Sequence, residues 1–266
     1  KLGGGPDVGP VGGGPGLPSP RVEYVNTEPF DISYKIERAG RSGIQAAQLY
    51  VLADRAAGWT LGKRYPINPV ATTGDSLKLP YSPPDPGNGR SNEGTYGFYV
   101  GPESGAGTKA DPPGPNTPPM VYVVYDKTRP FINITGVRVG AGGAKGPVVE
   151  ITWETSDQNL LADPISLEYA DDPTAVRWKE IRYRLPPGTE RQDADGLKKN
   201  VGQFAWEVPD EKLWKFYVKA RSVDRAGNSS ESVWKDAVIV DLEKPAATIT
   251  GVRGGPGGGG GGGGAA

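Results

Sequence analysis

The residues that could do chemistry in this 266-residue chain are chiefly carboxylates, because the sequence contains no histidine and no cysteine. That inventory excludes Ser-His-Asp triads, Cys-His dyads and zinc or iron sites ligated by histidine. Two carboxylates can act as acid and base in a glycosidase, but the 31 acidic residues form many pairs and no spacing sets one pair across a cleft. We therefore predict a protein that is not an enzyme and has neither catalytic residues nor a cofactor.

Two groups of aspartates raise the question of calcium. Asp193-Ala194-Asp195-Gly196 resembles the middle of a calcium loop, but Arg191 and Gly202 stand where such a loop needs its first and twelfth ligands. Asp126 and Asp241 each precede a proline-containing segment and could bind calcium at a domain junction. The simpler interpretation is that aspartate and proline end one strand and start the next. We predict no metal site and keep junction calcium at Asp126 as the alternative.

Three tryptophans are the one positive indication of a binding surface. Trp206, Trp214 and Trp234 show no aromatic counterpart in the first copy of the repeat described below. Two of them exposed on one face would form a stacking platform for sugar rings, and we take all three as candidate carbohydrate-binding residues. Packing over an edge strand or a sheet is the alternative interpretation.

The overall charge argues against several classes of partner. The 30 basic and 31 acidic residues are intermixed, the net charge is −1, and no stretch is dense in lysine or arginine. We therefore do not expect nucleic acid or an anionic membrane surface as a partner. No apolar run approaches the roughly 18 residues of a membrane-spanning helix. The chain begins at Lys1 without a signal-like segment, which indicates an internal piece of a longer protein.

One sequence pattern occurs twice. Residues 124–138 match residues 239–253 at an offset of 115, and both contain Ile-Thr-Gly-Val-Arg. Further pairs lie at offsets of 118 or 119: Tyr34 with Trp153, Tyr50 with Tyr169, Trp59 with Trp178, and Phe98-Tyr99-Val100 with Phe216-Tyr217-Val218. Because the offset drifts only slightly, we infer two tandem copies with loop insertions, followed by the first strand of a third copy.

Hydrophobic periodicity assigns these copies to the all-β class. Phe30, Ile32 and Tyr34 alternate with polar residues, as do Ile151 and Trp153, which is typical of half-buried strands. No segment keeps a helical apolar stripe. About 100 structured residues per copy, in short strands with regular turns, predict two tandem antiparallel β-sandwiches.

The 41 glycines and 27 prolines help to place the boundaries, because they concentrate at the two ends. The predicted segments are a disordered Gly/Pro-rich linker at 1–18, a first sandwich at 19–127, a second at 128–242, the start of a truncated third repeat at 243–253 and a polyglycine tail at 254–266.

Several motifs of the second copy resemble one known group. They are Leu167-Glu168-Tyr169, Trp178-Lys179-Glu180-Ile181, residues 202–209 and residues 216–229, the last containing the turn Asp224-Arg225-Ala226-Gly227-Asn228. In these the copy is similar to the bacterial immunoglobulin-like and fibronectin type III-like repeats of large surface and secreted proteins. The first copy departs from the pattern after Val100, where Gly101-Pro102-Glu103-Ser104-Gly105 and a proline-rich loop replace that turn.

The resemblance implies immunoglobulin-like (fibronectin type III-like) sandwiches in an extracytoplasmic protein, either secreted or on the cell surface. It implies a non-catalytic structural or adhesive spacer, monomeric, whose partners are neighbouring immunoglobulin-like domains and a surface polysaccharide or protein. A carbohydrate-binding or substrate-positioning module of a secreted enzyme is the alternative, because these sandwiches carry many functions.

Overall fold

The computed structural model of the chain describes residues 20–53, 58–140, 142, 146–185, 189–192, 197–209, 213–240 and 246–251. Every regular element in these ranges is a β-strand, so the predicted all-β class is confirmed. None of the described residues belongs to a helix that could cross a membrane. The predicted disordered ends and the Asp193-Ala194-Asp195-Gly196 motif lie outside the described residues.

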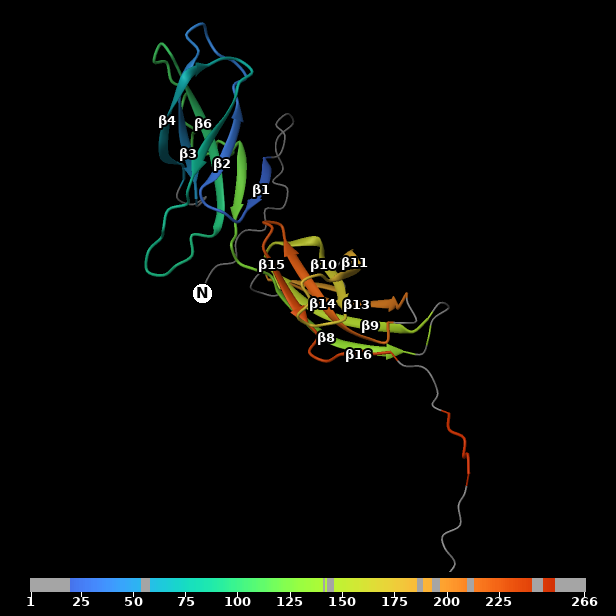
Figure 1. The fold of residues 1–266 in the computed structure, drawn as a ribbon. Coiled ribbons are helices and arrows are strands. Elements are labelled where there is room, and N and C mark those ends of the chain that lie inside the picture. The colour runs from blue at the N-terminus through green and yellow to red at the C-terminus, as the bar shows by residue number, and fades with distance from the viewer. Residues whose placement is uncertain are drawn as a thin grey trace, which may run out of the picture.

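The first group of strands forms a five-stranded and a two-stranded sheet (Figure 1). The larger sheet has the order β1-β7-β6-β3-β4, in which β1 runs parallel to β7 and all other neighbours are antiparallel. The smaller sheet pairs β2 with β5. The bounds are β1 Arg21–Val25, β2 Phe30–Lys35, β3 Ile44–Leu52, β4 Thr60–Ala71, β5 Ser76–Tyr81, β6 Gly94–Ser104 and β7 Val121–Tyr125.

The second group forms two antiparallel sheets. One has the order β11-β10-β14-β15, with β16 also paired to β14, and the other has the order β12-β13-β9-β8. The bounds are β8 Phe131–Gly140, β9 Val148–Asp157, β10 Leu160–Ala170, β11 Lys179–Leu185, β12 Thr189–Gln192, β13 Lys198–Glu207, β14 Lys215–Asp224, β15 Ser229–Val233 and β16 Val238–Ile239.

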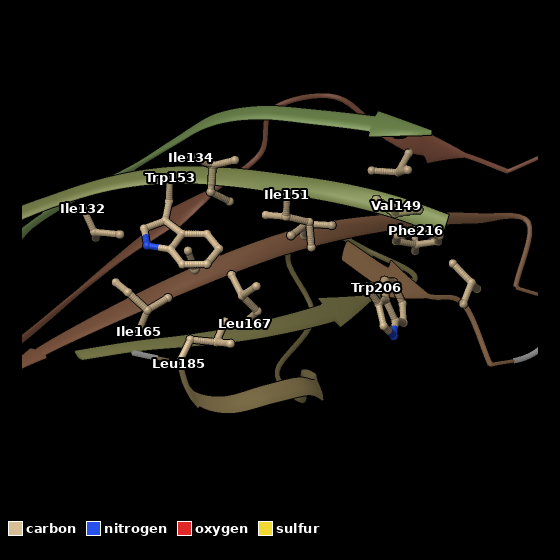
Figure 2. Packing of buried hydrophobic residues seen from close by; sticks show 14 of the residues in the cluster. Ile132, Ile134, Val149, Ile151, Trp153, Ile165, Leu167, Leu185, Trp206 and Phe216 are labelled. Atoms are coloured by element: carbon tan, nitrogen blue, oxygen red, sulfur yellow. The ribbon is translucent and has the colours of Figure 1, made fainter. Parts of the chain in front are cut away.

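Each group of strands has buried apolar side chains of its own. The largest cluster draws all its fully buried members from residues 132–240, and the other two draw theirs from residues 30–125 and 36–71. Figure 2 shows Ile151 and Trp153 of β9 facing Ile165 and Leu167 of β10 across the largest cluster. Two sheets that face each other across one core fit a β-sandwich.

The alternating sequence explains why these strands bury one face. In β9, Val149, Ile151 and Trp153 are almost completely buried, whereas the residues between them are more exposed. Trp153 lies against Gly202 on the neighbouring strand β13, where a Cβ atom would come within 2.5 Å of the indole Cζ2. Glycine at this position therefore makes room for the largest side chain of the core.

The two groups share one pairing pattern. β2 pairs with β5 as β9 pairs with β13, and β3 lies between β4 and β6 as β10 lies between β11 and β14. The first strand of each group differs in position. β1 pairs with β7 at the edge of the five-stranded sheet, whereas β8 pairs with β9 in the sheet that does not contain β14. Similar local sequences thus give the same central strands and a different position for the first strand.

The expected first strand of a third copy does not appear in the described part of that segment. Residues 246–251 are exposed and have no strand pairing, although the matching residues 131–136 form the first half of β8. A strand is stable only when its backbone groups pair with a neighbour. Within the described residues, 246–251 pair with no other strand, which explains the difference.

Candidate functional site

Three aspartates converge where the two groups of strands meet. Asp126 follows the last strand of the first group, Asp157 ends β9 and Asp224 ends β14. Carboxylate oxygens of all three lie within 4.8 Å of one another. Their side chains come from segments far apart in the sequence, and the residues are only 6%, 4% and 1% exposed. We call Asp126, Asp157 and Asp224 the junction carboxylates.

A local turn fixes each of these carboxylates. The backbone N–H of Thr128 donates to Oδ1 of Asp126 at 2.9 Å, and the N–H of Asn159 donates to Oδ1 of Asp157 at 2.6 Å. The N–H of Asn228 donates to Oδ1 of Asp224 at 2.8 Å. Aspartate favours such turns because its short side chain reaches the backbone two to four residues further on.

Two asparagine side chains of the second group bind the first group at Asp126. Asn159 Nδ2 donates to Asp126 Oδ2 at 2.6 Å, and Asn228 Nδ2 donates to the Asp126 carbonyl oxygen at 2.8 Å. Asn228 Nδ2 also donates to Asp224 Oδ2 at 2.7 Å. On the other side, the Asp126 N–H donates to the carbonyl oxygen of Val25 at 2.9 Å. Asp126 is therefore held by hydrogen bonds from both groups of strands.

Burial raises the pKa of all three junction carboxylates, and repulsion from neighbouring carboxylates adds to this at Asp126 and Asp157. Burial is the main cause in each case, and it raises the pKa of Asp157 to about 7, with further increases from the charges of Asp126, Asp224 and Glu93. Burial also acts to raise the pKa of Glu93, but hydrogen bonds from Ser91 and from residues 127–128 lower it overall. Glu93 therefore stays charged beside the cluster.

The arrangement is suited to holding a positive charge or sharing protons. Three carboxylates with close oxygens are the kind of donor that Ca²⁺ prefers, and like charges this close cannot all ionise without a cost. Asp126, the residue named from the sequence, would thus bind calcium with Asp157 and Asp224, which sequence reasoning missed. Asp241 lies outside the described residues.

A sequence signal for the two missed residues does exist. Both Asp157 and Asp224 end a strand with a downstream asparagine, and their positions in the first copy, at the offsets of the neighbouring aromatic pairs, hold Arg38 and Ala106. The acids are therefore particular to the second copy. What the sequence lacks is any indication that the two turns lie at the same end of the sheets as Asp126.

The three candidate carbohydrate-binding tryptophans occupy different environments. Trp206 is 7% exposed and packs in the second core, with its ring centre 4.9 Å from that of Tyr169 and 5.3 Å from that of Phe216 (Figure 2). Trp234 is partly buried against the same core. Trp214 is 59% exposed. Among these three, only Trp214 offers an open ring face, so they do not provide the two exposed indoles that the stacking platform needs.

Two of these tryptophans do have aromatic counterparts in the first copy. Trp206 stands opposite Val149 as Tyr81 stands opposite Phe30, and both rings pack edge-on against a phenylalanine of the facing sheet. Trp214 precedes Phe216 by two residues, as Tyr96 precedes Phe98. The sequence comparison missed the first match because its offset is 125, whereas the aromatic pairs before and after it lie at offsets of 119 and 118.

One groove lies elsewhere on the first group of strands. It runs between the edge strands β4 and β5, has a volume of about 380 Å³ and is lined by residues that include Tyr34, Tyr65, Asp75 and Lys78. None of the sequence-predicted binding residues lines it. Prolines at positions 66, 69 and 80 interrupt the backbone donors of both edges, which discourages the addition of another strand.

The comparisons with known proteins add no functional assignment. No protein-family model matches this chain, and a search of curated proteins finds no significant relative.

Proposed function

We propose that the chain is a tandem of two immunoglobulin-like, fibronectin type III-like units that acts as a non-catalytic structural or adhesive spacer. The support for this fold family comes first from strand order. In each group a sheet with the order β4-β3-β6-β7 or β11-β10-β14-β15 accompanies a second sheet built around β2-β5 or β9-β13. This division of strands resembles the two sheets of an immunoglobulin-like sandwich.

A tyrosine near the start of β6 gives further support. The Tyr96 hydroxyl donates to the carbonyl oxygen of Asn92, four residues upstream, at 2.6 Å. Immunoglobulin-like sandwiches use such a tyrosine corner to fix the connection that leads into the equivalent strand. Exposed Trp214 takes the same place in the second copy, and its indole has no hydroxyl group to make this bond.

The main support for a spacer role is the set of hydrogen bonds that join the two units at their junction. Each unit has its own buried cluster, and Asp126 between them accepts hydrogen bonds from Asn159 and Asn228 of the second unit. Pro130 fixes its own φ and keeps Arg129 extended. Two compact bodies joined by a short, bonded segment would keep a set distance between whatever is attached at either end.

The proposed setting follows from the same resemblance. Immunoglobulin-like tandems of this kind belong to large extracytoplasmic proteins, so we propose neighbouring domains of the parent protein as the principal partners, with a surface polysaccharide or protein as an adhesive contact. Carbohydrate binding stays a prediction, and the exposed indole of Trp214 is the feature that supports it.

Small-angle X-ray scattering on the full chain tests the spacer proposal. A compact globule of 266 residues would have a radius of gyration of about 18 Å. A spacer should give a larger radius and a pair-distance distribution with a second shoulder from the distance between the two units. A single symmetrical peak near the compact value would contradict the proposal.

A further inference from the structure

We infer that the Asp224-Arg225-Ala226-Gly227-Asn228 turn is a clamp that grips the preceding unit, so that a junction is stiff where the following unit carries this turn. This inference rests on the proposed spacer function and specifies which residues supply the stiffness. The partner of the clamp is a copy of the same module placed immediately before it in the chain.

Arg225 makes the first of two contacts between the turn and the preceding unit. Its Nη1 donates to the hydroxyl oxygen of Tyr24 in β1 at 2.9 Å, and its guanidinium carbon lies 5.4 Å from the centre of the Tyr24 ring. An arginine over an aromatic ring combines a cation–π contact with a hydrogen bond. Figure 1 shows the connection between β14 and β15 beside the end of the first group of strands that contains β1.

Hydrogen bonds within its own unit hold Arg225 in place. The Arg225 backbone N–H donates to the Asn159 carbonyl oxygen at 2.8 Å, and Arg225 Nε donates to the Leu160 carbonyl oxygen at 3.2 Å. These two bonds fix the direction of the side chain before it reaches Tyr24. Because these bonds order the side chain in advance, they lower the entropy cost of immobilising it at an interface.

The other end of the turn supplies a second contact. Asn228 Nδ2 donates to the Asp126 carbonyl oxygen, and Gly227 between the two contacts has a φ of 90°, which favours glycine. Arg225 and Asn228 therefore bind the first unit at two points, on β1 and just after β7. Two separated points resist rotation about the linker better than one, so this turn is more than a strand connection.

The first unit has no turn with an arginine and an asparagine at these positions. At the offset of the Phe98 and Phe216 pair, the turn corresponds to residues 106–110, Ala-Gly-Thr-Lys-Ala, which contain neither the arginine nor the asparagine. That segment bonds within its own unit instead: the N–H of Gly107 donates to the Ser104 carbonyl oxygen at 2.9 Å, and the N–H of Ala110 donates to the Pro102 carbonyl oxygen at 3.0 Å. A copy placed before Arg21 would meet no such clamp, so stiffness follows the sequence of the turn.

Pulsed electron spin resonance between two spin labels tests the clamp in the full chain. Cysteines introduced by Lys35→Cys in β2 and Glu180→Cys in β11 would be unique labelling sites, because the chain has no cysteine. We expect one narrow distance distribution. Arg225→Ala should broaden it about twofold or more, towards that of units joined by a linker alone. Tyr24→Phe removes only the hydroxyl and should broaden it in the same direction.

A matched control separates the clamp from a general effect on β14. Arg221 lies on the same strand and donates to Ser229 of its own unit, so Arg221→Ala should leave the distribution narrow. Melting curves check that each variant remains folded. A narrow distribution in Arg225→Ala and Tyr24→Phe would overturn the clamp and leave the spacer intact. A broad distribution in the unmutated chain would overturn the semi-rigid spacer itself.

Discussion

Replacing Asp157 with asparagine removes one of the three buried carboxyl groups at the junction while nearly preserving the side chain's shape. The amide oxygen of asparagine can still accept the hydrogen bond from the Asn159 N–H. What changes is the charge. The variant therefore isolates the cost of burying a third carboxylate beside Asp126 and Asp224.

The magnitude follows from the pKa of Asp157. The pKa rises from 3.8 to about 7 in the folded protein, a change of roughly 3 units at ~1.4 kcal/mol per unit, or about 4 kcal/mol. Asp157 is 4% exposed, so solvent screening does little to reduce this value. Above pH 7 the ionised carboxylate thus lowers the free energy of unfolding by up to that amount, in the absence of a bound cation.

The sign of the pH dependence follows from which state holds the proton. Between pH 4 and pH 7 the folded chain keeps Asp157 protonated while the unfolded chain does not, so this group makes stability fall as pH rises through that interval. Asp157→Asn should abolish this contribution. We expect the variant to match the unmutated protein near pH 4 and to exceed it in stability above pH 7.

Urea denaturation at pH 4.5 and pH 8 in the presence of EDTA measures the difference, with tryptophan fluorescence reporting mainly on the second unit, which contains five of the six tryptophans. Asp171→Asn changes an exposed aspartate and should have little effect at either pH. Equal stability of Asp157→Asn and the unmutated protein at pH 8 would refute the reasoning, as would a stability that falls on substitution.

The remaining predictions concern the same junction and the tryptophans. If the junction carboxylates bind Ca²⁺, calorimetry at pH 8 should show a higher melting temperature with calcium, because binding adds about 2.7 kcal/mol to the unfolding free energy at a hundredfold excess over Kd, and Asp224→Asn should abolish the increase. Trp206→Ala should cost about 3 to 5 kcal/mol of unfolding free energy, because the indole is buried in the second core; a loss below 1 kcal/mol in urea denaturation would contradict its placement. Trp214→Ala should change stability by less than about 1 kcal/mol. On the spacer proposal, affinity electrophoresis with soluble polysaccharides should show the same mobility for this variant as for the unmutated chain; a retardation that the variant loses would support the carbohydrate alternative instead. Gly202→Ala should lower the melting temperature of the second unit, because the added methyl group would meet the Trp153 ring.

Local sequence was sufficient for the all-β class and for much of the second core. Strand alternation has a period of two, so the buried face of β9, with Val149, Ile151 and Trp153, could be read directly from residue types. The repeated Phe98 and Phe216 likewise identified two buried anchors. These features depend on neighbours in the chain, which is why a single sequence reveals them.

The candidate site depended on tertiary structure. Asp157 and Asp224 end β9 and β14, and Asp126 follows β7, so only the folding of these three strands with their ends together brings the carboxylates within 4.8 Å. The burial of Trp206 was also decided by strand register, because pairing with Val149 turns its ring into the core. Periodicity tells which face of a strand is apolar, but not which strand ends lie together, since that depends on pairings between residues far apart in the chain.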